Sequence, residues 1–261
     1  EPGVSSESAA GGLQKIVEVR TDATVSSSAR LSNIKLAMQK INLYILEPGQ
    51  QFSYNAVVGA RTEAAGFKEA TAYSGATVTK EVGGGICQVS STLYEAALLA
   101  GLQIDERHPH SMTVAYTEAG KDATVSESGN QDLKFTNNTE HTIYIYAAVD
   151  HNEAADKDYA RITLFSAPLP YTVTINNQIT NSISYGSRYE RDWTGEYAYY
   201  TDEYVFQQAG KPGCHCSTER IFYDAQTGEE ILREHLSDDV YNPLDATYWV
   251  GVHNHDGSIA N

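Results

Sequence analysis

Two segments in the first hundred residues carry apolar side chains at helical spacing. Within 28–41 these side chains recur three or four residues apart, and the same spacing returns between Ile86 and Ala100. A helix with this pattern has one apolar face that packs on a core, and Gly101 is a typical residue just past a helix end. The pattern therefore predicts two amphipathic helices in this part of the chain.

Segments rich in Thr, Val, Ile, Tyr and Phe follow the predicted helices and are typical of strands. They are 113–117, 133–136, 142–148 and 161–165. The charged stretch 150–158 is predicted to be a loop between two of these strands, and 218–223 with 230–235 read as a hairpin. We predict an α+β fold in which N-terminal helices pack on a mostly antiparallel sheet, followed by a small β-rich module.

Composition divides the chain of 261 residues into three parts. A polar, flexible linker is predicted at 1–18, a main domain at 19–168 and the tyrosine-rich β module at 169–261. The formal net charge of −16 argues against nucleic acid and against anionic membrane surfaces, because both attract basic patches. The sequence contains no run of eighteen apolar residues that would cross a membrane.

A run of three glycines is followed by Ile86 and Cys87, at the start of the second predicted helix. A thiol at a helix N-terminus lies beside unpaired backbone N–H groups and the positive end of the helix dipole, which favour the thiolate. The main-chain N–H groups of Gly85 and Gln88 are candidates for binding an oxyanion. Cys87 is therefore a candidate nucleophile, and the alternative is a buried cysteine that packs as a small apolar residue.

A cysteine nucleophile needs a base and a group that orients the base. His108 and His110 are two residues apart, so an extended strand would point both to one face. We favour His110 as the base, with His108 as the rival and Asp122 as the orienting carboxylate. The alternative is that one histidine is a solvated loop residue and the other a satisfied strand residue.

Two further cysteines, Cys214 and Cys216, lie close together and far from Cys87. They are consistent with a strained disulfide, with two surface thiols, or with half of a metal site that includes His215 or a later histidine. A metal site needs ligands placed from elsewhere, and no second cysteine pair exists, so no metal is predicted.

Taken together, these motifs resemble a VanW domain over about residues 20–148. The matching blocks are 48–55, 58–62, 66–67, 83–94, 100–102, 106–111, 122–125 and 132–139. The resemblance implies a cell-wall L,D-transpeptidase that acts on peptidoglycan stem peptides, with Cys87 as nucleophile and no cofactor. Arg61, in one matched block, is expected either to bind a substrate carboxylate or to form a structural ion pair.

The tyrosine-rich part, at about 185–252, resembles a diverged G5-type module of cell-wall proteins. Such a module would bind wall polymer, with Tyr197, Tyr199 and Tyr200 as sugar-stacking faces, although half-buried strand tyrosines are the favoured interpretation. We expect a monomer outside the cytoplasm, on the cell wall or the outer face of the plasma membrane. The export signal or membrane anchor is expected in a segment upstream of this chain.

The predicted function is a transpeptidase that forms 3-3 cross-links in peptidoglycan through a thioester on Cys87. One alternative is an L,D-carboxypeptidase, in which water replaces the acceptor amine. The other is a non-catalytic accessory protein that binds peptidoglycan or a glycopeptide, with the helix start binding a carboxylate.

Overall fold

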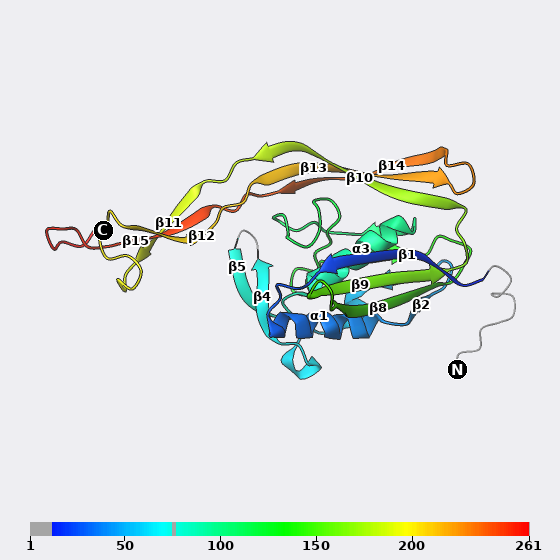
Figure 1. Cartoon of the computed structure of the whole chain (residues 1–261), viewed down its shortest axis with the longest axis horizontal. Coiled ribbons are helices and arrows are strands. Elements are labelled where there is room, and N and C mark those ends of the chain that lie inside the picture. The colour runs from blue at the N-terminus through cyan, green and yellow to red at the C-terminus, as the bar shows by residue number, and fades with distance from the viewer. Residues whose placement is uncertain (1–11, 75–76, 261) are drawn as a thin grey trace.

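Four antiparallel strands form the main sheet of the N-terminal half. The computed structural model describes residues 12–74 and 77–260. The sheet order is β1 (Gln14–Asp22), β9 (Lys157–Ser166), β8 (Ile143–Asn152) and β2 (Tyr44–Leu46) (Figure 1). Alternate residues of β1, β8 and β9 are buried, which gives the sheet one apolar face.

Two helices cover this apolar face, as the spacing of apolar residues predicted. Helix α1 (Ser28–Ile41) packs on β8, and α3 (Ile86–Leu99) packs on β1 and β9 beside α1. The Ser27 hydroxyl accepts a hydrogen bond from the Arg30 N–H at 3.2 Å, which caps the start of α1. No helix in the described ranges is long and apolar enough to span a lipid bilayer.

Shorter elements surround the two long helices. Helix α2 (Tyr54–Val58) and the 3-10 turn η1 (Glu63–Ala65) lie between them in sequence. Strands β3 (Gln51–Ser53), β7 (Lys134–Thr136) and β6 (Gln103–Glu106) form one small sheet. The hairpin of β4 (Glu69–Ser74) and β5 (Thr77–Val82) leads directly into the glycines before α3.

The fold is mostly β, with 45% strand and 15% helix, so the predicted α+β layout holds only in part. A strand, β1, precedes the first helix, and further strands lie between the helices. The predicted strand 113–117 is wrong, because this segment forms an irregular loop with no strand partner. The expectation that His108 and His110 lie on an extended strand is also wrong, since both follow β6 in a loop.

The last third of the chain forms an elongated arrangement of strands that we call the β-arm (residues 171–251). Its first sheet has the order β10 (Tyr171–Ile183), β13 (Gly213–Asp224), β14 (Glu230–Tyr241), and β13 and β14 are the predicted hairpin. Its second sheet has the order β11 (Ser187–Asp192), β15 (Ala246–Gly251), β12 (Tyr204–Gln208). The first sheet runs along the N-terminal half, and the second continues beyond it (Figure 1).

Hydrogen bonds join the β-arm to the N-terminal half. The buried Arg220 on β13 donates from Nη1 to the Leu102 carbonyl at 2.7 Å, and the Asn242 N–H donates to the Ser111 carbonyl at 2.7 Å. Cys214 and Cys216 are free thiols, buried with Tyr241 in a small cluster, and therefore neither a disulfide nor surface thiols. This cluster is small beside the core under the main sheet, so the arm depends on its contacts with the N-terminal half.

Candidate functional site

The glycine run forms a tight turn that presents Cys87 at the start of α3. Gly83 and Gly85 have φ values of 91° and 107°, a region that side chains other than glycine rarely adopt. A Cβ atom on Gly84 would lie 2.4 Å from the Ala70 carbonyl oxygen, so only glycine fits against β4. The buried Asn33 side chain on α1 donates to the Gly84 carbonyl at 3.0 Å and fixes the turn to the helix layer.

Cys87 lies in the first turn of α3 and is half-buried. Its Sγ is 3.7 Å from the Thr124 hydroxyl and 3.6 Å from the Val125 carbonyl oxygen. The N–H groups of Gly85 and Cys87 have no main-chain acceptor among the residues that the structure describes. The thiol therefore lies next to free donors at the positive end of the helix dipole.

His110 and Asp122 form a buried pair next to the thiol. His110 Nδ1 lies 2.6 Å from Asp122 Oδ2, and the His110 main-chain N–H donates to the same oxygen at 2.7 Å. On the other side of the imidazole, the Tyr116 hydroxyl lies 3.4 Å from Nε2, and His110 lines the same cavity as Cys87. Asp122 thus orients an imidazole that shares a cavity with the thiol, an arrangement similar to that of cysteine–histidine–carboxylate sites.

The charges at this site favour a thiolate–imidazolium pair. Burial raises the pKa of the Cys87 thiol, but the hydrogen bond and the charge of His110 outweigh burial, so this pKa lies below its ordinary value. Burial lowers the pKa of His110, but the hydrogen bonds to Asp122 and Cys87 outweigh it and raise this pKa to about 9. Both shifts favour the charged form of the side chain, the thiolate for Cys87 and the imidazolium for His110.

Hydrogen bonds of the next residue, Ala123, hold the segment that contains Asp122 against α3. The Ser90 hydroxyl donates to the Ala123 carbonyl at 2.6 Å, and the Ala123 N–H donates to the Ser91 hydroxyl oxygen at 3.0 Å. Both serines lie about one helical turn after Cys87, so the helix that carries the nucleophile also positions the carboxylate.

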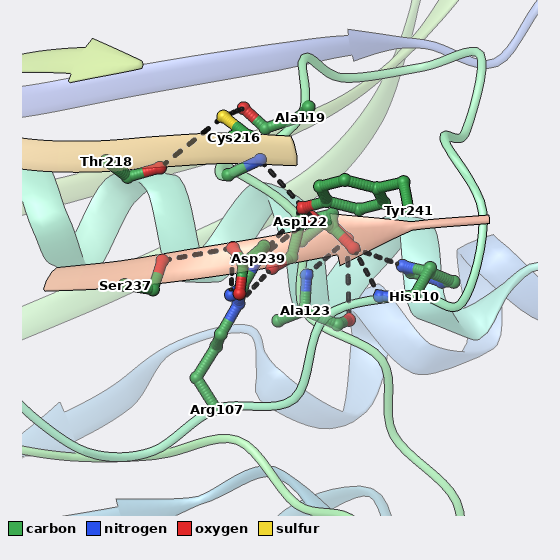
Figure 2. A network of polar contacts seen from close by, with 12 residues as sticks. Arg107, His110, Ala119, Asp122, Ala123, Cys216, Thr218, Ser237, Asp239 and Tyr241 are labelled. Carbon is green, nitrogen blue, oxygen red and sulfur yellow. Dashed lines mark hydrogen bonds and ion pairs between the residues drawn. The ribbon is translucent and has the colours of Figure 1, made fainter. Parts of the chain in front are cut away.

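The β-arm supplies a further part of this network, as Figure 2 shows. Asp122 Oδ1 accepts hydrogen bonds from the Tyr241 hydroxyl at 2.5 Å and from Arg107 Nη2 at 2.9 Å. Tyr241 also accepts from the Gly120 N–H at 2.7 Å, and Arg107 Nη1 pairs with Asp239 at 2.6 Å. Since Tyr241 and Asp239 belong to β14, the arm holds the carboxylate that orients His110.

Cys87 and His110 line one cavity of about 620 Å³. Tyr116, in the segment that was predicted as a strand, and Met112 just before it also line this cavity. A second cavity of about 760 Å³ lies between β6 and β14, and neither Cys87 nor His110 lines it. The volume of the first cavity is within the range of small-ligand sites.

Three other predicted site residues, Gln88, His108 and Arg61, do not contact the His110–Asp122 pair through any hydrogen bond of the described residues. The Gln88 side chain is fully buried and donates to Thr21 and to the Asp22 carbonyl on β1. Its main-chain N–H donates to the Gly85 carbonyl at 3.1 Å, so the prediction that this N–H is free to bind an oxyanion is wrong. His108 Nε2 lies 3.0 Å from Glu106 Oε1, and His108 is not among the described residues that line the cavity. Arg61 lines the cavity with Cys87.

Sequence reasoning missed several residues of the site, namely Asn33, Arg107, Tyr116, Thr124, Asp239 and Tyr241. Arg107 directly precedes His108 in the sequence, and a charged residue at this position could have been identified as a candidate site residue. Tyr241 is 119 residues from Asp122, and no local pattern links the two.

Comparison with known proteins identifies the N-terminal half. Residues 29–156 match the family model described as VanW like protein. The chain is 43% identical over 122 residues to "Uncharacterized protein YoaR" of Bacillus subtilis, covering 47% of this chain and 40% of that protein. It is 30% identical over 137 residues to "Vancomycin B-type resistance protein VanW" of Enterococcus faecalis, covering 50% of this chain and 49% of that protein. The chain thus spans less than half the length of each of these two relatives.

Two solved structures are similar to about a third of the chain. One is titled "IgA1 Protease G5 domain structure", with 20% identity, 31% of this chain and 90% of the solved chain covered, and a TM-score of 0.19. The other, "Crystal structure of HP0197-G5", has 15% identity, 31% and 97% coverage, and a TM-score of 0.18. The family match and the two relatives confirm the resemblance of the N-terminal half to a VanW domain, so the chain is a VanW-domain protein, whereas the G5-type module stays a prediction.

Proposed function

We propose that this protein is a cysteine-dependent L,D-transpeptidase that forms 3-3 cross-links in peptidoglycan. The observation that carries the proposal is that Cys87, at the start of α3, lines one cavity with His110, whose Nδ1 lies 2.6 Å from Asp122 Oδ2. An activated thiol with an oriented base is the arrangement that acyl transfer requires. The VanW-like family match supports the resemblance from which a cell-wall substrate is inferred.

In the first half of the reaction, the Cys87 thiolate attacks the carbonyl carbon of the L-centred third residue of a donor stem tetrapeptide. The N–H groups of Gly85 and Cys87 stabilise the resulting oxyanion. The C–N bond then breaks, and the proton on His110 Nε2 passes to the departing nitrogen. The products are a thioester on Cys87, free D-alanine and neutral His110.

In the second half, the amine of a neighbouring stem peptide attacks the thioester carbonyl. His110 Nε2 accepts the proton from this amine, the C–S bond breaks, and the thiolate–imidazolium pair returns. Asp122 accepts the hydrogen bond from His110 Nδ1 throughout and keeps Nε2 directed at the reacting atoms. The energy of the cleaved peptide bond is retained in the thioester, so the reaction requires neither a cofactor nor ATP.

The substrate also indicates the cellular location of the protein. Stem peptides are substrates outside the cytoplasm, so we propose an extracytoplasmic protein associated with the cell wall or the outer face of the membrane. The β-arm exposes Tyr197 and Tyr199, which stack on Trp249 and His253 rather than filling a strand core. These flat aromatic surfaces support a role for the arm in binding wall polymer.

The test is mass spectrometry of disaccharide-tetrapeptide muropeptides after incubation with the protein. We expect a cross-linked dimer with loss of D-alanine, absent with Cys87→Ala and retained with the matched control Cys214→Ala. Tripeptide without dimer, still dependent on Cys87, would instead identify an L,D-carboxypeptidase. Unchanged substrate that both the protein and Cys87→Ala still bind would overturn catalysis in favour of an accessory binding protein.

A further inference from the structure

Arg61 is a cation at the edge of the catalytic cavity, beside the glycine turn. A Cβ atom on Gly83 would lie 3.2 Å from the Arg61 Cβ, so the arginine packs directly against this turn. The guanidinium carbon is 6.0 Å from the centre of the Tyr54 ring, and the Tyr54 hydroxyl donates to the Ile86 carbonyl at 3.2 Å. Arg61 therefore lies next to the residues that hold Cys87.

The guanidinium of Arg61 has hydrogen-bonding capacity that the described residues leave unused. Its Nη2 donates to the Asn55 side-chain oxygen, whereas Nε and Nη1 are buried and have no partner in the described part of the chain. Other enclosed arginines differ, since Arg107, Arg161 and Arg220 each pair with a carboxylate. The structural ion pair considered for Arg61 is therefore absent among the described residues.

The unused donors match one class of ligand. Buried donors without an acceptor are unfavourable, and a carboxylate is the acceptor with which a guanidinium forms strong, charge-assisted hydrogen bonds. Asn55 is itself fixed, because its main-chain N–H donates to Asp132 at 2.8 Å and its side-chain amide donates to the Gln131 carbonyl at 2.9 Å. The arginine is thus held in place before any ligand arrives.

We propose that Arg61 binds the terminal carboxylate of the D-amino acid that leaves the donor peptide. This inference rests on the proposed function, because it assigns the leaving-group side of the same cavity. One residue spans about 3.6 Å of chain, so the carboxylate beyond the scissile bond must be bound close to Cys87. A free carboxylate at the fourth residue then distinguishes a tetrapeptide donor from a pentapeptide, in which an amide occupies that position.

The test is binding to the Cys87→Ala variant, which keeps the cavity and has no nucleophile. N-acetyl-D-alanine and its neutral amide, N-acetyl-D-alaninamide, are titrated separately and followed by NMR. We expect the carboxylate to bind at least ~10-fold more tightly than the amide, the magnitude of one charge-assisted hydrogen bond. Adding Arg61→Gln is expected to remove this preference, whereas the matched loss of an exposed charge, Lys40→Gln, leaves it unchanged.

Equal binding of the two ligands, or a preference that survives Arg61→Gln, would overturn the carboxylate subsite. This readout does not depend on catalysis, so failure to form a thioester would refute the proposed function and leave the subsite standing. The melting temperature of Arg61→Gln supplies an independent readout. We expect it to stay equal or rise, because unpaired buried donors are removed, whereas a structural arginine would lower it on substitution.

Discussion

Replacing His110 with glutamine tests whether this residue activates Cys87. The substitution removes the imidazolium that outweighs burial, so the pKa of the thiol rises and its thiolate fraction at pH 7 falls. His108→Gln is the matched control, because His108 contacts Glu106 and does not line the cavity among the described residues. The pair of variants separates the two histidines that the sequence offers as bases.

The size of the effect follows from the coupling of two titrating groups. The pKa of His110 is raised from 6.5 to about 9, and hydrogen bonds to both Asp122 and Cys87 cause this increase. Because linkage is reciprocal, the amount by which the thiolate raises the pKa of His110 equals the amount by which the imidazolium lowers that of Cys87. Loss of a neighbouring opposite charge lowers the ionised fraction of a group by ~10- to 100-fold, which is the fall in Cys87 thiolate expected here.

The assay is the rate of Cys87 alkylation by iodoacetamide as a function of pH, with the modified residue identified by mass spectrometry. The unmodified protein is expected to react readily at pH 7, because its thiolate forms below the ordinary pKa of a thiol. For His110→Gln we expect a rate at pH 7 lower by ~10- to 100-fold that rises tenfold per pH unit toward pH 9. Equal rates for this variant and the unmodified protein would refute activation by His110, as would an equal loss in His108→Gln.

Two further substitutions test how the site is supported. Tyr241→Phe leaves the buried Gly120 N–H without its acceptor, so we expect a loss of about 2 kcal/mol and a melting temperature lower by roughly 4–8 °C, with exposed Tyr189→Phe near zero. A melting temperature unchanged in Tyr241→Phe would show that the β-arm does not support the site. Gly84→Ala places a Cβ 2.4 Å from the Ala70 carbonyl oxygen, so we expect ~1–3 kcal/mol of destabilisation. We also expect slower alkylation of Cys87 at the adjacent helix start. Normal stability and normal alkylation of this variant would contradict the tight turn.

Local sequence was sufficient to predict the elements that depend on neighbours in the chain. The spacing of apolar residues predicted α1 and α3, because a helix packs one face on a core whatever that core is made of. The glycines before Cys87 predicted a turn followed by a helix start, since this geometry is set within a few residues. Hairpin β13–β14 was predicted on the same grounds.

The segment 113–117 shows where composition misleads. Its β-branched and aromatic residues favour a strand, but strand formation requires a partner, and no strand of the described chain lies alongside it. Tyr116 lines the cavity instead and reaches His110. Residue types with high strand propensity are those that fit a half-buried surface. The wall of a cavity is also half-buried, so the same residue types occur there without forming a strand.

The sequence by itself determined the helices, the turn that exposes Cys87, and a short set of candidate partners: two histidines and one aspartate. The tertiary structure brought His110 rather than His108 to the thiol, because the loop after β6 bends His110 toward Asp122. It also brought Tyr241 to that carboxylate across 119 residues of sequence. Contacts of this kind depend on which separate elements pack together, and no local pattern in the sequence specifies which distant residues meet.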